Sequence, residues 1–163
     1  MAKAKKPESA IALLMEDHEY VKKAFRAFEK MDEEDQPALV KQVCQALKVH
    51  TKIEEEIFYP AVRRAIKDED LMNEAEVEHD SAKSLIKQLE RMKPSDPKFA
   101  ATFTVLGEYV NHHVKEEEEE WFPKVRDAMT RTRLAELGDA MEKAKKTAPR
   151  KPVPERVAEG AAR

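Results

Sequence analysis

The feature that most constrains the fold of this chain is an internal repeat. The segment HTKIEEEIFYPAVR at residues 50–63 aligns without a gap with HVKEEEEEWFPKVR at residues 113–126. The two copies share a histidine, a lysine, three glutamates, a proline, a valine and an arginine. A second pair of segments, 17–31 and 78–92, also aligns without a gap. We therefore expect two similar halves packed about a pseudo-two-fold axis.

Composition and periodicity indicate that both halves are helical. Only three of the 163 residues are glycine, whereas glutamate, lysine and alanine are abundant. Strands and their tight turns would need more glycine and more β-branched residues. Apolar residues recur at helical spacing, which predicts four long helices over about residues 9–30, 37–66, 71–92 and 97–128. The short polar connections between them favour an all-α, up-down-up-down antiparallel four-helix bundle.

Several residues are expected to shape the ends and the course of these helices. Ser9 and Asp35 stand where N-caps are needed, immediately before the first and second helices. Pro60 and Pro123 lie inside the second and fourth helices at matching positions of the repeat. Because proline has no backbone N–H, each should remove one helical hydrogen bond and bend its helix.

The sequence also predicts segments outside the four helices. An additional short C-terminal helix is expected over about residues 131–145, because apolar residues again recur at helical spacing. Three of them would pack on the bundle: Leu134, Leu137 and Met141. The expected domain layout is a flexible N-terminal segment at 1–8, the bundle with its C-terminal helix at 9–146, and a disordered, proline- and charge-rich tail at 147–163.

Charge and hydropathy argue against several classes of partner. Lys+Arg number 30 and Asp+Glu number 33, giving a net charge of −3, so we expect no nucleic-acid partner. No apolar run approaches the roughly 20 residues needed to span a bilayer, and the N-terminus lacks the apolar stretch of a signal peptide. Cys44 is the only cysteine, which excludes an intrachain disulfide. We therefore expect a cytoplasmic protein without a membrane partner; protein partners are not predicted.

The repeated positions carry the chemistry of a metal site. Residues four apart lie on one face of a helix, so His50 pairs with Glu54 and His113 with Glu117. Their apolar neighbours place these faces inward, and the same holds for His18 and His79. A lone core histidine is more often a hydrogen-bonded packing residue than a ligand. Four of the five histidines at repeat-related positions favour metal ligation instead, by six residues: His18, His50, Glu54, His79, His113 and Glu117.

The donor types narrow the choice of metal. Two facing carboxylates in a bundle core would repel each other, and cations between them remove that repulsion. Imidazole-rich ligation suits iron, zinc, copper or nickel, whereas magnesium and calcium prefer oxygen ligands. Structural zinc sites are usually single and tetrahedral, so a paired arrangement points to iron, although spacing alone does not decide the metal. Two histidines for each ion and two shared carboxylates would leave a position open for a small molecule.

These six residues, with FYP and WFP after the glutamate-rich runs, closely resemble the hemerythrin-like (HHE cation-binding) family. The resemblance covers about residues 9–145 and implies a four-helix bundle around a non-haem di-iron centre. It implies that an oxo or hydroxo group and two carboxylates bridge two iron ions (Fe2+/Fe3+). The implied assignment is one iron on His18 and His50, the other on His79 and His113, and Glu54 and Glu117 as bridges.

The sequence departs from oxygen-carrying hemerythrins at one place. Those proteins have a second histidine one turn before the residue that matches His79, where this chain has Ala75. The resemblance then implies two irons that are more alike and more open. Glu76 is an alternative ligand that we favour less, because the first half has Met15 at the matching position. His112 is the neighbour of His113 that the repeat does not select, so we expect it to point away from the metal.

Three functions remain from the sequence. The first is a non-haem di-iron protein that binds or reacts with oxygen, nitric oxide or peroxide in sensing, storage, scavenging or iron handling. The second is an enzyme of catalase or peroxidase type that decomposes hydrogen peroxide at the same centre. The third is a structural or zinc-binding helical bundle. Four aromatic residues are expected to wall the site as core residues rather than to transfer electrons: Phe58, Tyr59, Trp121 and Phe122.

Overall fold

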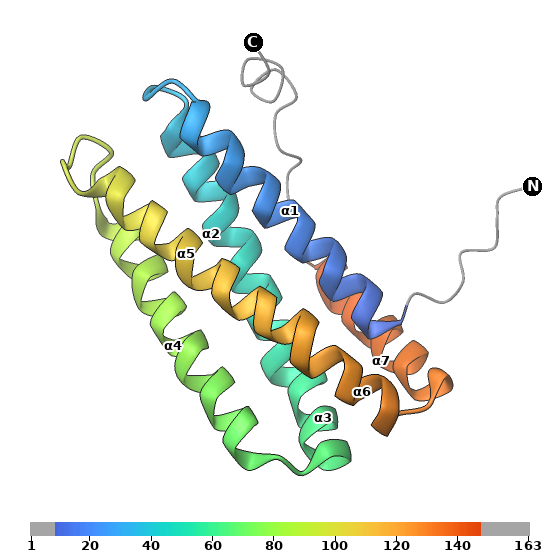
Figure 1. Cartoon of the computed structure of the whole chain (residues 1–163). Coiled ribbons are helices and arrows are strands. Elements are labelled where there is room, and N and C mark those ends of the chain that lie inside the picture. Colours follow the sequence, from blue (N-terminus) through green and yellow to red (C-terminus); the bar gives the residue numbers. More distant parts are fainter. Residues whose placement is uncertain (1–8, 148–163) are drawn as a thin grey trace, which may run out of the picture.

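Four long helical segments run antiparallel and form a bundle, with a fifth segment packed beside one end (Figure 1). The computed structural model describes residues 9–147. The helices are α1 (Ala10–Lys30), α2 (Gln36–Ile53), η1 (Glu54–Phe58), α3 (Tyr59–Ile66), α4 (Glu69–Arg91), α5 (Phe99–Glu116), η2 (Glu117–Trp121), α6 (Phe122–Ala128) and α7 (Arg131–Lys146). The second long segment is α2, η1 and α3, and the fourth is α5, η2 and α6. The predicted all-α bundle with an additional C-terminal helix is confirmed.

Short polar residues precede four of the helices, and three of these residues form capping hydrogen bonds. The Ser9 hydroxyl accepts a hydrogen bond from the backbone N–H of Ala12 at 3.2 Å, which confirms its predicted role. Asp35 stands at the N-cap position of α2, but its side chain makes no capping bond. Its backbone is already helical there, whereas a capping residue is typically extended. Two further caps, Asp68 and Thr130, accept hydrogen bonds at the starts of α4 and α7.

The two copies of the repeat leave α-helical geometry at the same place. The turns η1 and η2 are π-helical, and the N–H groups of Tyr59 and Phe122 donate to the carbonyls of Glu54 and Glu117 five residues earlier. Each turn directly precedes a proline-containing segment, where the missing N–H breaks the α-helical pattern. The structure therefore accommodates the prolines by a widened turn next to the candidate ligands.

The widened turns change which side chains share a face. In an α-helix, residues five apart are separated by about 140° around the axis. A π turn widens the helix, so residues five apart lie closer to one face. Tyr59 is therefore brought toward the face that carries Glu54. Phe122 is brought toward that of Glu117 in the same way.

Apolar side chains form two core clusters, one on each side of the candidate ligands along the bundle. One cluster lies near the α1–α2 and α4–α5 turns and contains Phe25, Phe28 and Phe103, with ring centroids 4.8 and 4.5 Å apart. The other contains Phe58 and Trp121 together with residues of α3, α6 and α7. The six predicted ligands lie between these clusters, so both ends of the site are closed by packed apolar residues.

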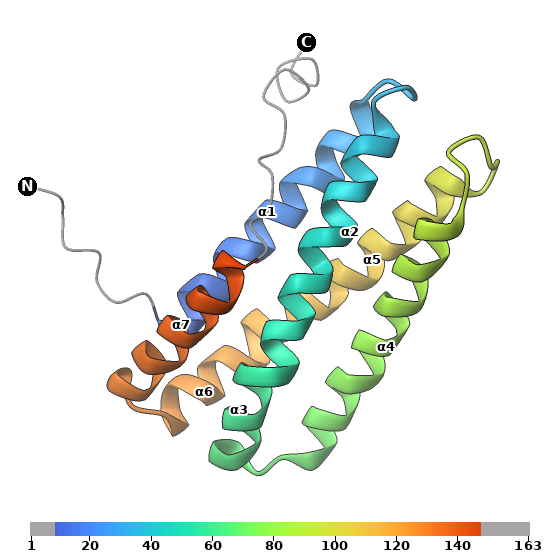
Figure 2. The ribbon, with the colours of Figure 1, turned by 180° about the vertical axis from the view of Figure 1, so that it is seen from behind.

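The C-terminal helix α7 belongs to the second core cluster. Leu134, Leu137 and Met141 are buried there, as the sequence predicted. The helix lies along the first half of α1, which both opposite views show (Figure 2). It therefore covers the bundle on the side of α1.

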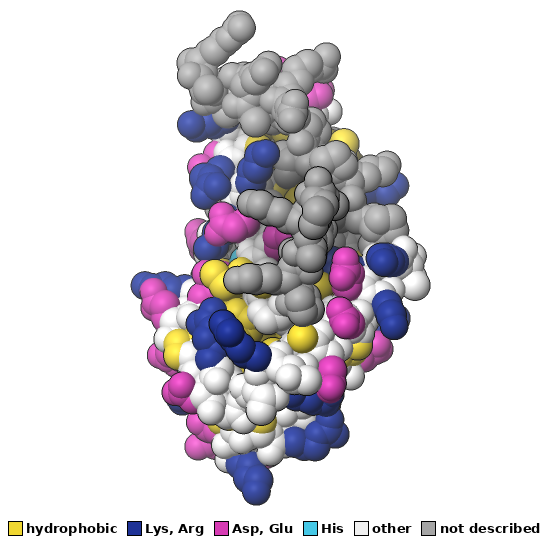
Figure 3. Space-filling view, turned by 90° about the vertical axis from the view of Figure 1, so that its right-hand side faces the viewer, with side chains coloured by type: hydrophobic (Ala, Val, Ile, Leu, Met, Phe, Trp, Pro, Cys, Tyr) yellow, Lys and Arg dark blue, Asp and Glu magenta, His cyan; other side chains and the backbone are white. Residues whose placement is uncertain are grey.

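The surface of the bundle carries charged side chains of both signs. On the face seen in Figure 3, side chains of both charge signs are interspersed, with small apolar areas between them. Within residues 9–147, no helix has the length and apolar character needed to cross a membrane. The expectations for the segment 1–8 and for the tail concern residues that, apart from Thr147, lie outside the described part of the chain.

Candidate metal centre

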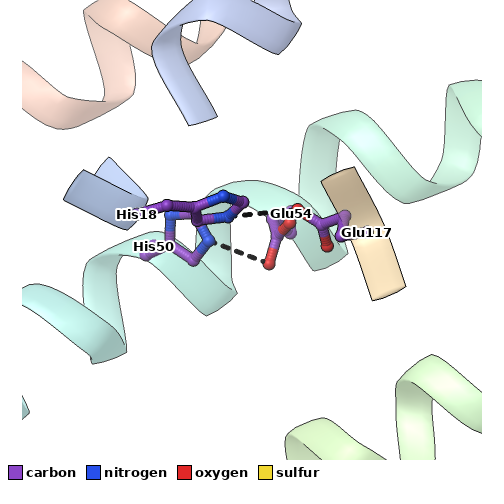
Figure 4. Close-up of side chains that lie close together, drawn as sticks. All are labelled: His18, His50, Glu54 and Glu117. Carbon is purple, nitrogen blue, oxygen red and sulfur yellow. Dashed lines mark ion pairs between the residues drawn. The ribbon is translucent and has the colours of Figure 1, made fainter. Parts of the chain in front are cut away.

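The structure brings all six predicted ligands together at the middle of the bundle. Each of the four long segments contributes one histidine: α1, α2, α4 and α5. The two glutamates come from the first residues of η1 and η2. Figure 4 shows two of the imidazoles, His18 and His50, directed toward Glu54 and Glu117. Both glutamate side chains are 0% exposed, so two carboxylates are enclosed in the core.

The histidines form two pairs. Ring centroids are 5.3 Å apart for His18 and His50, and 4.9 Å apart for His79 and His113. These pairs correspond to the two ions that the resemblance implied. Their candidate ligand atoms also fall into two groups, each compact enough to hold one ion, and Glu54 belongs to both groups.

The two glutamates connect the pairs. Oε1 of Glu117 lies 3.3 Å from Nε2 of His18, and Oε2 of Glu117 lies 3.0 Å from Nε2 of His113. Oε1 of Glu54 lies 3.2 Å from Nε2 of His50 and 3.2 Å from Nε2 of His79. Each carboxylate therefore faces one histidine from each pair, which is the arrangement that a bridging ligand needs.

In the first hairpin, formed by α1 and α2, a carboxylate contacts Nδ1 of each histidine. Nδ1 of His18 lies 2.6 Å from Glu118, and Nδ1 of His50 lies 2.8 Å from Asp17. Since a carboxylate only accepts, each Nδ1 keeps a proton, and Nε2 is the nitrogen that could offer a lone pair to an ion once its own proton is displaced. This is the tautomer that a metal-binding imidazole requires.

The second hairpin repeats this pattern with matching residues. Nδ1 of His79 lies 3.4 Å from Glu55, and Nδ1 of His113 lies 3.0 Å from Glu78. These acids correspond in the repeat to those of the first hairpin: Glu55 to Glu118, and Glu78 to Asp17. Sequence reasoning assigned them no role. The signal that could have found them was their recurrence beside each ligand in both copies.

Buried imidazoles and carboxylates in the site shift one another's pKa values. Burial opposes protonation of His50, but Glu54 and Asp17 outweigh it and raise its pKa to about 10. The pKa of His113 is likewise raised well above its usual range, because Glu117 and Glu78 outweigh the effect of burial. Burial acts to raise the pKa of Glu54, but His50 and His79 hold it well below the ordinary value. In the metal-free protein, protons thus occupy the place of cations.

Unpartnered atoms indicate that the site is built for ions. Four buried atoms in the centre make no hydrogen bond: Nε2 of His18, both carboxylate oxygens of Glu54 and Oε1 of Glu117. A buried polar atom without a partner costs roughly 1–3 kcal/mol, so such a cluster is rare in a core. All four atoms are metal-ligand types and face one another. The residues present therefore fit a pair of metal ions.

Tyr59 is a site residue that sequence reasoning placed only in the wall. Its hydroxyl oxygen lies 3.1 Å from Nε2 of both His79 and His113, and it donates to Glu117 at 2.9 Å. Burial and the two glutamates raise the pKa of the phenol well above its usual range. An uninterrupted α-helix would have turned this side chain away, and the π turn brings it in.

The remaining aromatic residues behave as the expected walls. Phe122 occupies the repeat position that matches Tyr59 and stacks on His18, with centroids 6.0 Å apart and planes 3° apart. Phe58 and Trp121 are buried in the core cluster beyond the ligands. One histidine pair therefore has an apolar ring beside it, and the other has a hydroxyl.

A small cavity opens from the histidines toward the middle of the bundle. Its volume is about 40 Å³. The ligand histidines form one side of it, and its other walls are mainly apolar: Val21, Leu47, Ala82, Ile86, Val110 and Val114. Pockets for organic substrates usually measure ~300 Å³ or more. The cavity has room for a diatomic molecule or a few waters, and not for a larger substrate.

Three residues weighed in the sequence lie outside the centre. His112 is 66% exposed and pairs with Glu116 at 3.1 Å, so it points away from the site as predicted. Glu76, the less favoured alternative ligand, binds Arg63 at 2.7 Å on the surface. Cys44 is buried in the core, and burial together with nearby Glu90 raises the pKa of its thiol to about 12.

Fold and site together define a helical-bundle protein with an interior cluster of histidines and glutamates that could hold metal ions. A sequence model described as Hemerythrin HHE cation binding domain matches residues 9–125. This match covers most of the chain, and the chain belongs to that family. The resemblance noted from the sequence is thereby confirmed, together with the coarser expectation that the domain binds metal cations.

Two known proteins are similar to this chain, one in structure and one in sequence. A crystal structure of a Hemerythrin HHE cation binding domain-containing protein from Mycobacterium kansasii superposes with a TM-score of 0.71 over 95% of this chain and 88% of that one, at 24% identity. At this identity the likeness shows the fold. A Nostoc sp. (strain PCC 7120 / SAG 25.82 / UTEX 2576) protein named DNA nickase is 32% identical over 89 residues, 55% of this chain and 25% of that protein. The aligned part thus spans about a quarter of that relative.

Proposed function

We propose that this protein holds two iron ions in the bundle and that this centre binds or reacts with oxygen, nitric oxide or peroxide. The observation that carries the proposal is the set of buried, unpartnered donor atoms that face one another between two histidine pairs. Two histidines for each ion and two shared carboxylates would leave coordination positions open. A non-haem di-iron centre of this kind supplies electrons and a binding position to a small molecule.

The protein's own residues would support this chemistry in three ways. The carboxylates behind the histidines fix the ring orientation and the tautomer, which commonly changes metal affinity by 10–100-fold. The mainly apolar walls limit the number of waters next to the ions. The hydroxyl of Tyr59, whose raised pKa keeps it protonated, can donate a hydrogen bond beside His79 and His113.

The cavity supports a small uncharged ligand. Its walls beyond the histidines are mainly apolar, and such walls favour an apolar diatomic molecule over an anion. We therefore place oxygen and nitric oxide first among the ligands. Sensing, storage, scavenging and iron handling are all compatible with this proposal.

Decomposition of hydrogen peroxide is the second candidate. It is favoured by the protonated hydroxyl of Tyr59 next to one histidine pair, because a hydrogen-bond donor at this position can orient a peroxide molecule. Ala75 stands where an additional histidine would close a coordination position, so that position would stay available.

The first experiment is a measurement of metal content with the near-ultraviolet and visible spectrum, before and after anaerobic iron loading. We expect about two irons per chain and absorption bands of a bridged di-iron centre. One tightly held zinc ion, or no iron uptake, would favour a structural or zinc-binding bundle. Glu56→Ala is a matched control, because this exposed residue lies near the ligands but outside the centre.

Reactivity is then tested on the loaded protein. Nitric oxide is added anaerobically, and hydrogen peroxide is added with oxygen evolution recorded. A spectral change with nitric oxide and no peroxide turnover above free iron would support the binding function. Turnover well above that of free iron would support the enzyme.

A further inference from the structure

In each half of the centre, a carboxylate accepts a hydrogen bond from Nδ1 of one histidine. The two halves differ in the residues that hold this carboxylate in place. Asp17 and Glu78 occupy matching positions in the repeat, and they bind Nδ1 of His50 and of His113. Asp17 is 6% exposed and enclosed beneath α7. Glu78 is only half-buried. The same chemical arrangement is therefore enclosed in one half and open to solvent in the other.

The carboxylate of Asp17 is divided between two partners. Its Oδ2 accepts from Nδ1 of His50 at 2.8 Å, and its Oδ1 accepts from Nζ of Lys145. Lys145 lies in the last turn of α7, 128 residues further along the chain. The ammonium group fixes the orientation of the carboxylate, and the carboxylate fixes the plane of the imidazole.

Packing of α7 holds Lys145 in place. Leu134, Leu137 and Met141 are buried against the bundle on the same helix, so the backbone that carries Lys145 is anchored by the core. The Lys145 side chain is 21% exposed, which places its charge in a partly desolvated position. Such an ion pair is screened less by solvent than a surface pair.

The other half has a weaker contact at the matching place. Within residues 9–147, the basic side chain that contacts Glu78 from outside the ligand set is His112, whose Nε2 lies 3.8 Å away and whose side chain is 66% exposed. This distance exceeds that of a hydrogen bond. Among the residues that the structure describes, no lysine or arginine pairs with Glu78 as Lys145 pairs with Asp17, so the contact from Glu78 to Nδ1 of His113 lacks this support.

We propose that Lys145 is a positioning residue of the metal centre: it orients His50 through Asp17, and it makes the ion of the His18/His50 pair the more tightly held of the two. This inference rests on the proposed two-ion centre. It gives α7 a role in the site that goes beyond packing. Lys145 does not contact the ligand itself but the carboxylate that orients it. Its loss is therefore expected to lower the affinity for that ion by roughly tenfold, the lower end of the usual range.

The test uses Co²⁺ as the probe in the full chain, with Lys145→Met as the main variant. Methionine keeps the length and apolar stem of lysine and removes the charge. Lys145→Arg tests rescue, and Lys143→Met is the matched control because Lys143 is an exposed residue of the same turn. Co²⁺ affinities are measured by competition with a chelator, and thermal unfolding of the metal-free variants checks the fold.

A second readout reports on His50 itself. Bound Co²⁺ shifts the proton signals of the ligand imidazoles, so exchange of each Nδ1–H with solvent can be followed by NMR. We expect Lys145→Met to lower the affinity for one of the two Co²⁺ ions about tenfold. Among the ligand histidines, only the His50 Nδ1–H should exchange faster with solvent. Lys145→Arg should restore both values, and Lys143→Met should change neither.

The outcomes separate this inference from the proposed function. Two Co²⁺ ions with unchanged affinities and unchanged exchange in Lys145→Met would overturn the role of Lys145 and leave the two-ion centre intact. Equal weakening of both ions, or weakening by Lys143→Met as well, would also overturn it. Failure of the unmodified protein to bind two ions would overturn the proposed centre and this inference together.

Discussion

The two hairpins have the same ligands and the same carboxylates behind them, yet their surroundings differ. Phe122 stacks on His18 in one half, whereas the hydroxyl of the matching Tyr59 contacts His79 in the other. Asp17 is held by Lys145, whereas the matching Glu78 faces the exposed His112. Two ions with equal ligands would thus have unequal environments, and the difference would lie in residues that do not ligate them.

This comparison explains how a repeated sequence can produce an asymmetric site. Metal ligation demands particular residue types at fixed spacing, so the repeat is strict at those positions. The neighbouring positions require only a ring of suitable size or a charge of suitable sign. The family resemblance implied two similar irons, and that stays a prediction. The candidate ligands are the same in both halves, and the differences lie in the residues that contact those ligands.

The largest effect should come from the residues that the halves share. Glu54→Ala or Glu117→Ala should remove roughly half or more of the bound iron, because each carboxylate faces a histidine of both pairs. Iron content and the near-ultraviolet bands measure this loss. Glu119→Ala, an exposed residue of the same turn as Glu117, is the control. Two irons per chain in both ligand variants would refute the bridging assignment.

The next effect is pH dependence, which should be common to both halves. The pKa of His50 is raised to about 10, and that of the matching His113 is also raised well above its usual range. At pH 7 the metal-free site therefore holds protons that the ions must displace, and uptake should release roughly two protons per centre. Indicator dye in weak buffer measures the release, and its absence would contradict the protonated metal-free state.

The same shifts give a stability prediction for the metal-free protein. Because the folded-state pKa of His50 exceeds the unfolded value, protonation stabilises the fold fully below about pH 6.5. That contribution is lost as the pH rises through about 10. Thermal unfolding of the metal-free protein should therefore occur at lower temperature as the pH rises from 7 to 10. The metal-loaded protein, in which ions replace these protons, is the control.

Changing either aromatic residue to its counterpart should make the two halves alike at this position. Tyr59→Phe removes the hydroxyl beside His79 and His113, and Phe122→Tyr adds one beside His18. We expect Tyr59→Phe to keep the iron content and to change the visible spectrum of the oxidised iron-loaded protein, because a phenol in contact with the site is lost. An unchanged spectrum in Tyr59→Phe would show that the hydroxyl serves only as a hydrogen-bond donor to Glu117.

The smallest effect should come from His112. Its side chain is exposed and contacts Glu78 only at 3.8 Å, so His112→Ala should leave iron content and spectrum nearly unchanged. Iron analysis of this variant beside His113→Ala checks the choice between neighbouring histidines. Loss of iron in His112→Ala with retention in His113→Ala would reverse that choice.

The sequence by itself determined the fold and the composition of the inner site. Helical periodicity and the scarcity of glycine predicted the bundle, because the spacing of apolar residues identifies the buried face of a helix. The recurrence of His-x-x-x-Glu in two copies selected the six ligand candidates, because residues four apart must share a helix face. Even the ambiguity at His112 and His113 was resolved by the repeat.

Only the tertiary structure decided the contacts that span segments or depend on irregular backbone. The phenol of Tyr59 enters the site because a π turn rotates it toward the ligands, and α-helical spacing cannot foresee that rotation. Lys145 reaches Asp17 because α7 docks along α1, an approach that depends on packing between segments far apart in the chain. Local spacing therefore fixes which residues can act as ligands, and three-dimensional packing fixes what surrounds them.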